Sequence, residues 1–149
     1  MRRWSYRGLS LGLICLLFVV TSVVVARDVP SGTISLHATS VAAGVGTQWG
    51  DGTLTLHNGK TYRFSIQGLE VGGVGFAEFH AQGTVYNLHK VSDLDGLYMA
   101  ADANVAVGSG PGTQTMRNER GVVINLSSEQ QGVKLTLGGQ GIRIALKDK

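Results

Sequence analysis

Cysteine is nearly absent from this chain, since only Cys15 occurs among 149 residues. It lies within an apolar run near the N-terminus, so the rest of the chain can form no disulfide and carries no thiol nucleophile. Ile14 stands where a bacterial lipid-attachment sequence has Gly or Ala, which disfavours lipidation of Cys15. Folding must therefore depend on a hydrophobic core without covalent cross-links.

Sequence motifs of the common enzyme classes are also missing. The glycine-rich residues 71–76 and 108–112 lack the Lys-Ser/Thr ending of a phosphate-binding loop and the complete GxGxxG pattern. No serine lies in a GxSxG nucleophile elbow. The glycines indicate sharp bends or close backbone approach instead. The sequence predicts a protein that is not an enzyme and binds no cofactor. An enzyme with a site assembled from scattered His, Asp and Glu is the least favoured alternative.

Metal-binding patterns are missing as well. Zinc requires three or four converging ligands, and the four histidines form no HxH or HxxxH pair. They are His37, His57, His80 and His89. Residues 92–96 (SDLDG) begin like a calcium loop, but Tyr98 and Asn104 stand where that loop requires Gly and a bidentate Glu. We expect strand and turn histidines, a solvated acidic turn and no metal site.

Positive charge is concentrated at the N-terminus. Arg2, Arg3 and Arg7 precede the apolar residues 8–25, and Ala26 ends a stretch suited to signal-peptidase cleavage. Residues 1–26 are therefore predicted to be a signal peptide, which implies export to the periplasm. An uncleaved inner-membrane anchor is the alternative, because about 18 apolar residues approach the spanning minimum.

Removal of residues 1–26 would leave ten basic and ten acidic residues, a formally neutral chain. Bulk charge then gives no reason to expect nucleic-acid binding.

Glycine is abundant and proline scarce, with 22 and 2 residues respectively. Together with frequent Val, Leu, Ile and Thr, this composition predicts one all-β domain over residues 27–149. Short connections favour a small antiparallel β-barrel or a tightly bent sandwich of about eight or nine strands. Four of the expected strand segments are residues 31–46, 74–91 (with a bend at Gly83), 96–108 and 113–121, the last ending in a turn.

Residues 53–67 (TLTLHNGKTYRFSIQ) form the clearest predicted hairpin. Its alternating apolar residues are Leu54, Leu56, Tyr62, Phe64 and Ile66. A two-residue Asn-Gly turn would place the two apolar rows on opposite faces. A three-residue loop of residues 57–59, with Gly59 left-handed, pairs Leu54 with Tyr62 instead. We therefore predict the three-residue loop.

Residues 122–146 predict three further strands. Their inward positions are Val122, Ile124 and Leu126, then Val133, Leu135 and Leu137, then Ile142, Ile144 and Leu146. Val123 and Lys134 are expected to face outward. The intervening loops would set Leu126 opposite Val133 and Leu137 opposite Ile142, which predicts a three-stranded meander.

Trp49 is the one candidate contact residue. Residues 44–52 (GVGTQWGDG) are predicted to form a glycine-rich loop. An exposed indole there could anchor lipid or a partner. The alternative is an indole folded back to plug one end of the barrel.

A family resemblance covers residues 71–146. Ala81-Gln82, residues 102–106 (DANVA) and Gly110-Pro111 follow one another as in the SYLF lipid-binding domain, and a polar strand, a glycine turn and a closing strand complete the pattern. The chain also resembles the related small-barrel envelope proteins of the EipA type. The resemblance implies a barrel without catalytic residues. The amphipathic helices that carry phosphoinositide binding in SYLF domains are absent from the front of this sequence.

Three functional hypotheses follow from the sequence. The first is a non-enzymatic exported protein of the cell envelope that binds envelope lipid or an envelope protein. The second is a structural or assembly module that acts through an exposed β-edge. The third is the enzyme without a recognisable motif.

Overall fold

The structure, a computed structural model, describes residues 29–39, 48–72, 78–101, 112–131, 134–137 and 140–147. These residues form nine β-strands and one short 3-10 helix. The elements are β1 (Pro30–Thr39), β2 (Gln48–Leu56), β3 (Thr61–Gly72), β4 (Glu78–Tyr86), η1 (Val91–Leu94), β5 (Gly96–Ala100), β6 (Thr113–Asn118), β7 (Val123–Ser128), β8 (Lys134–Leu137) and β9 (Ile142–Leu146). The predicted all-β class is confirmed.

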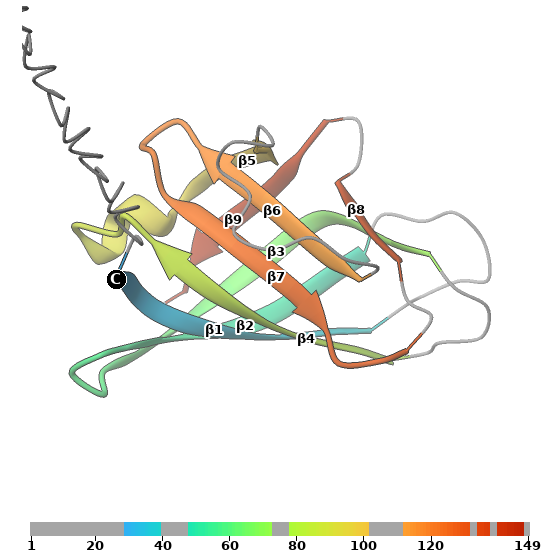
Figure 1. The fold of residues 1–149 in the computed structure, drawn as a ribbon, viewed down its shortest axis with the longest axis horizontal. Coiled ribbons are helices and arrows are strands. Elements are labelled where there is room, and N and C mark those ends of the chain that lie inside the picture. The colour runs from blue at the N-terminus through green and yellow to red at the C-terminus, as the bar shows by residue number, and fades with distance from the viewer. Residues whose placement is uncertain are drawn as a thin grey trace, which may run out of the picture.

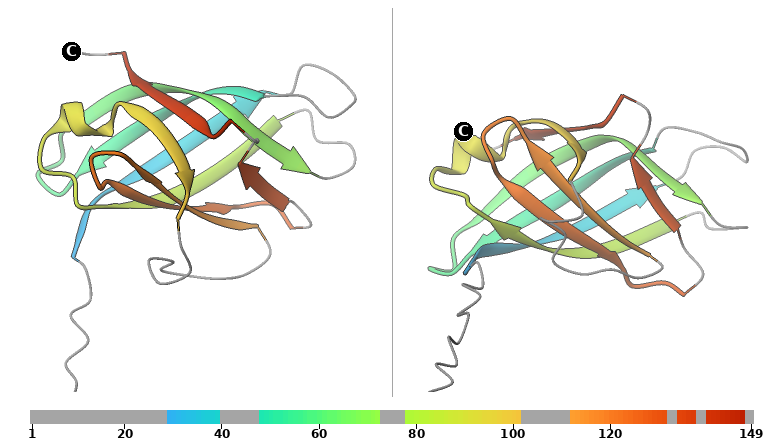
Figure 2. Two further views of the ribbon diagram at one scale, coloured as in Figure 1. Left: turned by 90° about the horizontal axis from the view of Figure 1, so that it is seen from above. Right: turned by 45° about the horizontal axis from the view of Figure 1, so that its top comes forward.

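Eight of the strands close into an antiparallel barrel (Figures 1 and 2). Neighbours follow the order β2–β1–β4–β7–β6–β5–β9–β3, and pairing between β3 and β2 completes the ring. The ninth strand, β8, pairs with β3 alone. Closure leaves no free edge around the eight-stranded ring itself, so the short β8 is the one described strand with a single partner.

The barrel interior is filled by apolar side chains, as expected for an eight-stranded barrel. Phe64, Ile66, Ile124, Leu126 and Ile144 are among its fully buried members. Two glycines of the wall show how tightly the interior is packed. A Cβ added to Gly52 would lie 2.2 Å from Phe64 Cζ, and one added to Gly83 would lie 2.9 Å from Ile34 Cγ1. Neither point has room for one further carbon atom.

The β2–β3 hairpin is built as the alternation predicted. Leu54 lies opposite Tyr62, and the Leu56 amide donates to the Lys60 carbonyl oxygen across 2.9 Å. Gly59 closes the three-residue loop with φ +82°. The predicted loop type and register are confirmed.

The predicted C-terminal meander is wrong. Its inward positions are nevertheless buried where the structure describes them, except Leu137, which is partly buried against the core. β7 pairs with β4 and β6, whereas β8 and β9 both pair with β3. β3 can hold both because it has 12 residues. Residues 64–67 of β3 pair with β9, and residues 69–72 pair with β8. Between them, Gly68 passes so close to the β8–β9 connection that an added Cβ would lie 2.5 Å from the Gly141 carbonyl oxygen.

Val123 was expected to face outward into solvent, but it is buried, with 2% of its surface exposed. In register it lies between Tyr86 of β4 and Arg117 of β6. Its neighbour Tyr86 is buried as well. The outer wall is thus partly covered at this point.

The loop predicted over residues 44–52 from its glycines is wrong where the structure describes it. Residues 48–52 belong to β2, and residues 44–47 lie outside the described part. Gly50 is needed there for close backbone approach, because its Cβ would lie 2.7 Å from the His37 carbonyl oxygen. β4 likewise continues through Gly83. The predicted turn after residue 117 is present, with Gly121 at φ +81°.

Candidate functional site

Polar side chains gather on the outer wall where β4, β1, β2 and β3 lie side by side. On β1 this follows from strict alternation, in which Ile34 and Leu36 are buried while Ser35 and His37 are exposed. The strand register then aligns one cross-strand row. It consists of His80 on β4, His37 on β1, Asp51 on β2 and Ser65 on β3. We call this surface the polar wall.

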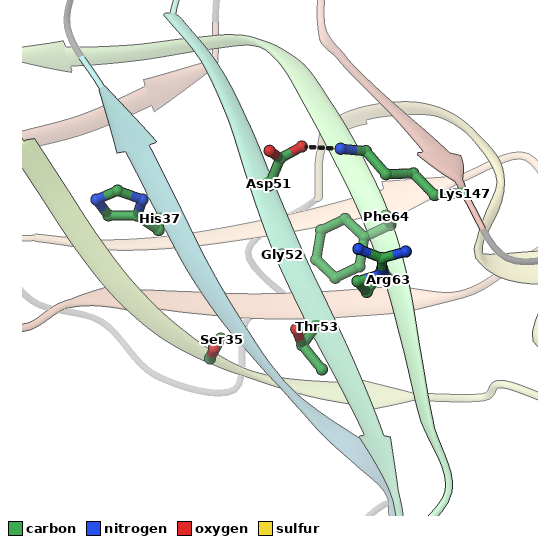
Figure 3. A pocket seen from close by; sticks show the side chains of 8 residues that line it. All are labelled: Ser35, His37, Asp51, Gly52, Thr53, Arg63, Phe64 and Lys147. Atoms are coloured by element: carbon green, nitrogen blue, oxygen red, sulfur yellow. Dashed lines mark hydrogen bonds and ion pairs between the residues drawn. The ribbon is translucent and has the colours of Figure 1, made fainter.

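An open depression of about 260 Å³ lies on the polar wall beside His37 (Figure 3). The Lys147 Nζ lies 2.5 Å from the Asp51 Oδ1 on its rim. These side chains are 43% and 70% exposed, so their ion pair contributes about 0–1 kcal/mol to stability. The Lys147 amide donates to the Arg63 carbonyl oxygen across 2.8 Å, which holds the chain after β9 against β3. The depression therefore combines charged groups at its rim with the apolar Phe64 ring, which lies directly at Gly52.

Two histidines meet at the β1 side of this depression. The rings of His37 and His80 stack with their centroids 4.6 Å apart and their planes inclined by 29°. Glu78 stands two residues before His80 on β4 and therefore on the same face. The candidate ligand atoms of His37, Glu78 and His80 all lie within 4.8 Å of one another, and all three residues are exposed. Two imidazoles and a carboxylate are a ligand set that zinc accepts.

The backbone of β4 at this cluster is held from both sides. β1 pairs along one edge, with His37 opposite His80. On the other side, the Glu129 amide donates to the His80 carbonyl oxygen at 3.2 Å, and the Gln130 Nε2 donates to the Glu78 carbonyl oxygen at 3.0 Å. Gln82 also hydrogen-bonds Glu129. The two strand positions that carry the β4 side chains are thus fixed.

Sequence reasoning missed this cluster, because it treated the four histidines as ordinary strand and turn residues. His57 fits that expectation, since it is the first residue of the β2–β3 loop and hydrogen-bonds the Pro30 carbonyl oxygen. His37 and His80 are strand residues as expected, but the β1–β4 pairing brings them together from 43 positions apart in the chain. The available sequence signal was Glu78-x-His80, a pair of potential ligands at alternate positions of one strand. Its partner strand could not be predicted.

The acidic segment SDLDG forms η1 and the start of β5. Its carboxylates accept backbone hydrogen bonds: Asp93 from the Lys90 amide at 3.2 Å, and Asp95 from the Leu146 amide. Tyr98 lies buried behind the segment, and its hydroxyl donates to the Leu94 carbonyl oxygen at 2.9 Å. Burial raises the pKa of Tyr98, and the nearby Asp95 adds to the increase.

Trp49 lies within β2, where its backbone is in register with Thr39 and Gln67. Its side chain is outside the described part of the structure. The register continues from Gln67 to Arg143 on β9 and then to Leu97 on β5. Leu97 and Met99 are exposed by 42% and 49%. We call residues 49, 67, 143 and 97 the tryptophan row.

Of the two glycine-rich stretches, Val71 and Gly72 continue β3, and Gly112 precedes β6. Residues 73–77 and 102–111 lie outside the described part. In the part of the chain that is described, no helix has the length and apolar character needed to cross a membrane.

The fold defines the class of this protein as a closed eight-stranded antiparallel β-barrel with one additional strand. Among solved structures, it is similar to a β-barrel-like, uncharacterised protein from Brucella abortus, known from a crystal structure. The two chains are 22% identical with a TM-score of 0.57, and the match covers 78% of this chain and 72% of the other. At this identity the similarity shows the fold alone. No protein-family model and no curated protein matches the chain.

The barrel that the EipA-type resemblance implied is thus present. The resemblance to the SYLF domain stays a prediction.

Proposed function

We propose that this chain is a non-enzymatic, exported protein of the bacterial cell envelope, and that its barrel binds through its outer wall. Binding through the outer wall, rather than inside the barrel, is supported by the filled interior. Neither Gly52 nor Gly83 leaves space for a further carbon atom, because Phe64 and Ile34 occupy those positions. An acyl chain held inside the barrel would need to displace these side chains. Binding at the outer wall requires no such rearrangement.

Export is supported by the basic and apolar character of residues 1–26. The similar barrel comes from a bacterium, Brucella abortus, which supports a bacterial source for this chain. Its function gives no further guidance.

Contact with envelope lipid is supported by one region of the outer wall. Leu97 and Met99 project from β5, and both are large apolar side chains left in solvent. In register, Leu97 faces Arg143 and Met99 faces Arg117. Both arginines are exposed. Aliphatic side chains flanked by cations suit the interface of an anionic membrane.

The alternative, an assembly module with an open β-edge, is supported by β8. Among the described strands it alone has a single partner, β3. With four residues, β8 offers little edge for an added strand. We therefore place it second.

Processing and location provide the test of the proposal. The full gene is expressed in a bacterium, and the protein is recovered from the periplasmic and membrane fractions for intact mass. We expect a chain that begins at Arg27, protected from protease in intact cells and degraded once the outer membrane is opened. A full-length mass in the membrane fraction would establish the anchor and keep the envelope location. Recovery of full-length protein from the cytoplasm would overturn the proposal.

A further inference from the structure

We propose that His37, Glu78 and His80 form a binding site for a divalent metal ion of the zinc class on the outer wall of the barrel. The site does not depend on the envelope location proposed above. It arises from two facts about the strands. Glu78 and His80 occupy alternate positions of β4, so both face outward. His37 is the direct cross-strand neighbour of His80 on β1.

The spacing of the three side chains suits one shared ion. Their ligand atoms lie within 4.8 Å of one another. Tetrahedral coordination at about 2.1 Å places two ligand atoms about 3.4 Å apart. The difference is small for exposed side chains, which change rotamer freely. The stacked imidazole rings need only tilt so that one nitrogen of each faces the Glu78 carboxylate.

The strand positions are fixed before any ion arrives. Both β4 carbonyl groups at the site accept hydrogen bonds from residues 129 and 130, and β1 pairs along the other edge. Binding therefore costs side-chain entropy and no rearrangement of the strands. Because the site joins two adjacent strands of the folded barrel, an ion bound there should also raise the free energy of unfolding.

The donor atoms select the class of ion. Two imidazole nitrogens favour Zn²⁺ and the neighbouring transition metals over Ca²⁺ and Mg²⁺, which prefer all-oxygen sites. Three protein ligands leave one tetrahedral position open for water or for a donor of another molecule. Asp51, the neighbour of His37 on β2, is engaged by Lys147. All three ligand residues are exposed, so the open position lies toward solvent.

The simplest competing explanation is that two exposed histidines became cross-strand neighbours without binding anything. Zinc titration distinguishes the two. The full chain, without a polyhistidine tag and in a nonionic detergent, is titrated with ZnCl₂ in a calorimeter. We expect one Zn²⁺ per chain. His37→Ala and His80→Ala should each weaken the affinity by about 10-fold or more, because each removes one ligand. Zn²⁺ should raise the melting temperature of the parent chain and not of these variants.

His89→Ala is the matched control, because it removes another exposed histidine outside the cluster. It should bind as the parent does. Glu78→His replaces one zinc ligand by another and should retain binding, whereas Glu78→Gln should weaken it. Affinity unchanged in both His37→Ala and His80→Ala would overturn the site. So would a parent chain that binds less than one equivalent at millimolar Zn²⁺.

Discussion

At the scale of single residues, Asn118 organises the end of the barrel where η1 meets the β6–β7 turn. It is 4% exposed, and its Nδ2 donates to the Asp93 carbonyl oxygen at 2.7 Å. Its Oδ1 accepts from the Arg120 and Val122 amides, both at 3.0 Å. A buried amide satisfied on both sides fixes its surroundings in one arrangement. The adjoining Tyr98 hydroxyl, bound to Leu94, belongs to the same buried polar region.

Tyr98 makes stability depend on pH in the alkaline range. Because burial raises its pKa in the folded state, the folded chain holds this proton more tightly than the unfolded chain. The resulting stability is complete below about pH 10, the unfolded pKa. It is lost as pH rises further, by up to about 1.4 kcal/mol per pH unit.

Tyr98→Phe should therefore cost about 1 kcal/mol in urea unfolding at pH 8, through the lost hydrogen bond. At pH 11 the variant should match or exceed the parent, since it has no buried hydroxyl to ionise. An equal cost at both pH values would show that the hydroxyl is not buried in the folded state.

The structural role of a residue could be predicted from the sequence where it depends on the alternation of neighbouring residues. Gly59 could be assigned to a left-handed loop position because the alternation around it allowed one loop length. Gly52 could not be assigned, since its role is to leave room for Phe64, a residue on another strand. The proximity of His37 and His80 could not be predicted for the same reason, because it depends on the pairing of β1 with β4.

At the scale of strands, alternation was predictable and partners were not. β9 shows buried Ile142, Ile144 and Leu146 with Arg143 exposed between them, as expected. Its partners are β3 and β5 rather than β8. Loop length favours pairing of consecutive strands, but it does not show that β3 extends past Gly68 and offers pairing positions to two later strands. The local β2–β3 hairpin was correct because turn and register lie within one short segment.

The alternation of β8 gives a test with an adjacent control. Leu135 is 4% exposed and belongs to the core, whereas its neighbour Lys134 is exposed. Leu135→Asp should destabilise the barrel by several kcal/mol, because it buries an unpaired charge. Lys134→Asp should change the free energy of unfolding by about 0.5 kcal/mol. Equal effects of the two variants in denaturant melts would contradict the inward orientation of β8 at Leu135.

At the scale of the whole molecule, composition and periodicity predicted a small antiparallel barrel or a tightly bent sandwich, and the structure is the barrel. They did not show whether the interior was hollow, and this point decides where a ligand can bind. Because Phe64 and Ile34 fill the space under two wall glycines, we propose the outer wall rather than the interior as the binding surface. Two parts of it differ in chemistry. The histidine cluster suits a metal ion, and the β5 side of the wall suits lipid.

The tryptophan row provides the test of lipid contact, because the register connects Trp49 on β2 to exposed Arg143 and Leu97. Trp4→Phe makes Trp49 the single indole of the full chain. Addition of anionic lipid vesicles should then shift its emission to the blue as the ring leaves water. Leu97→Gln should reduce the shift, because it removes an apolar neighbour of the row. Thr33 is exposed on β1 outside the row, so Thr33→Gln should leave the shift unchanged.

If the indole instead plugs the barrel, its emission is already blue without lipid, vesicles change nothing, and Trp49→Ala costs about 3–5 kcal/mol. That outcome would remove the tryptophan row as a lipid contact.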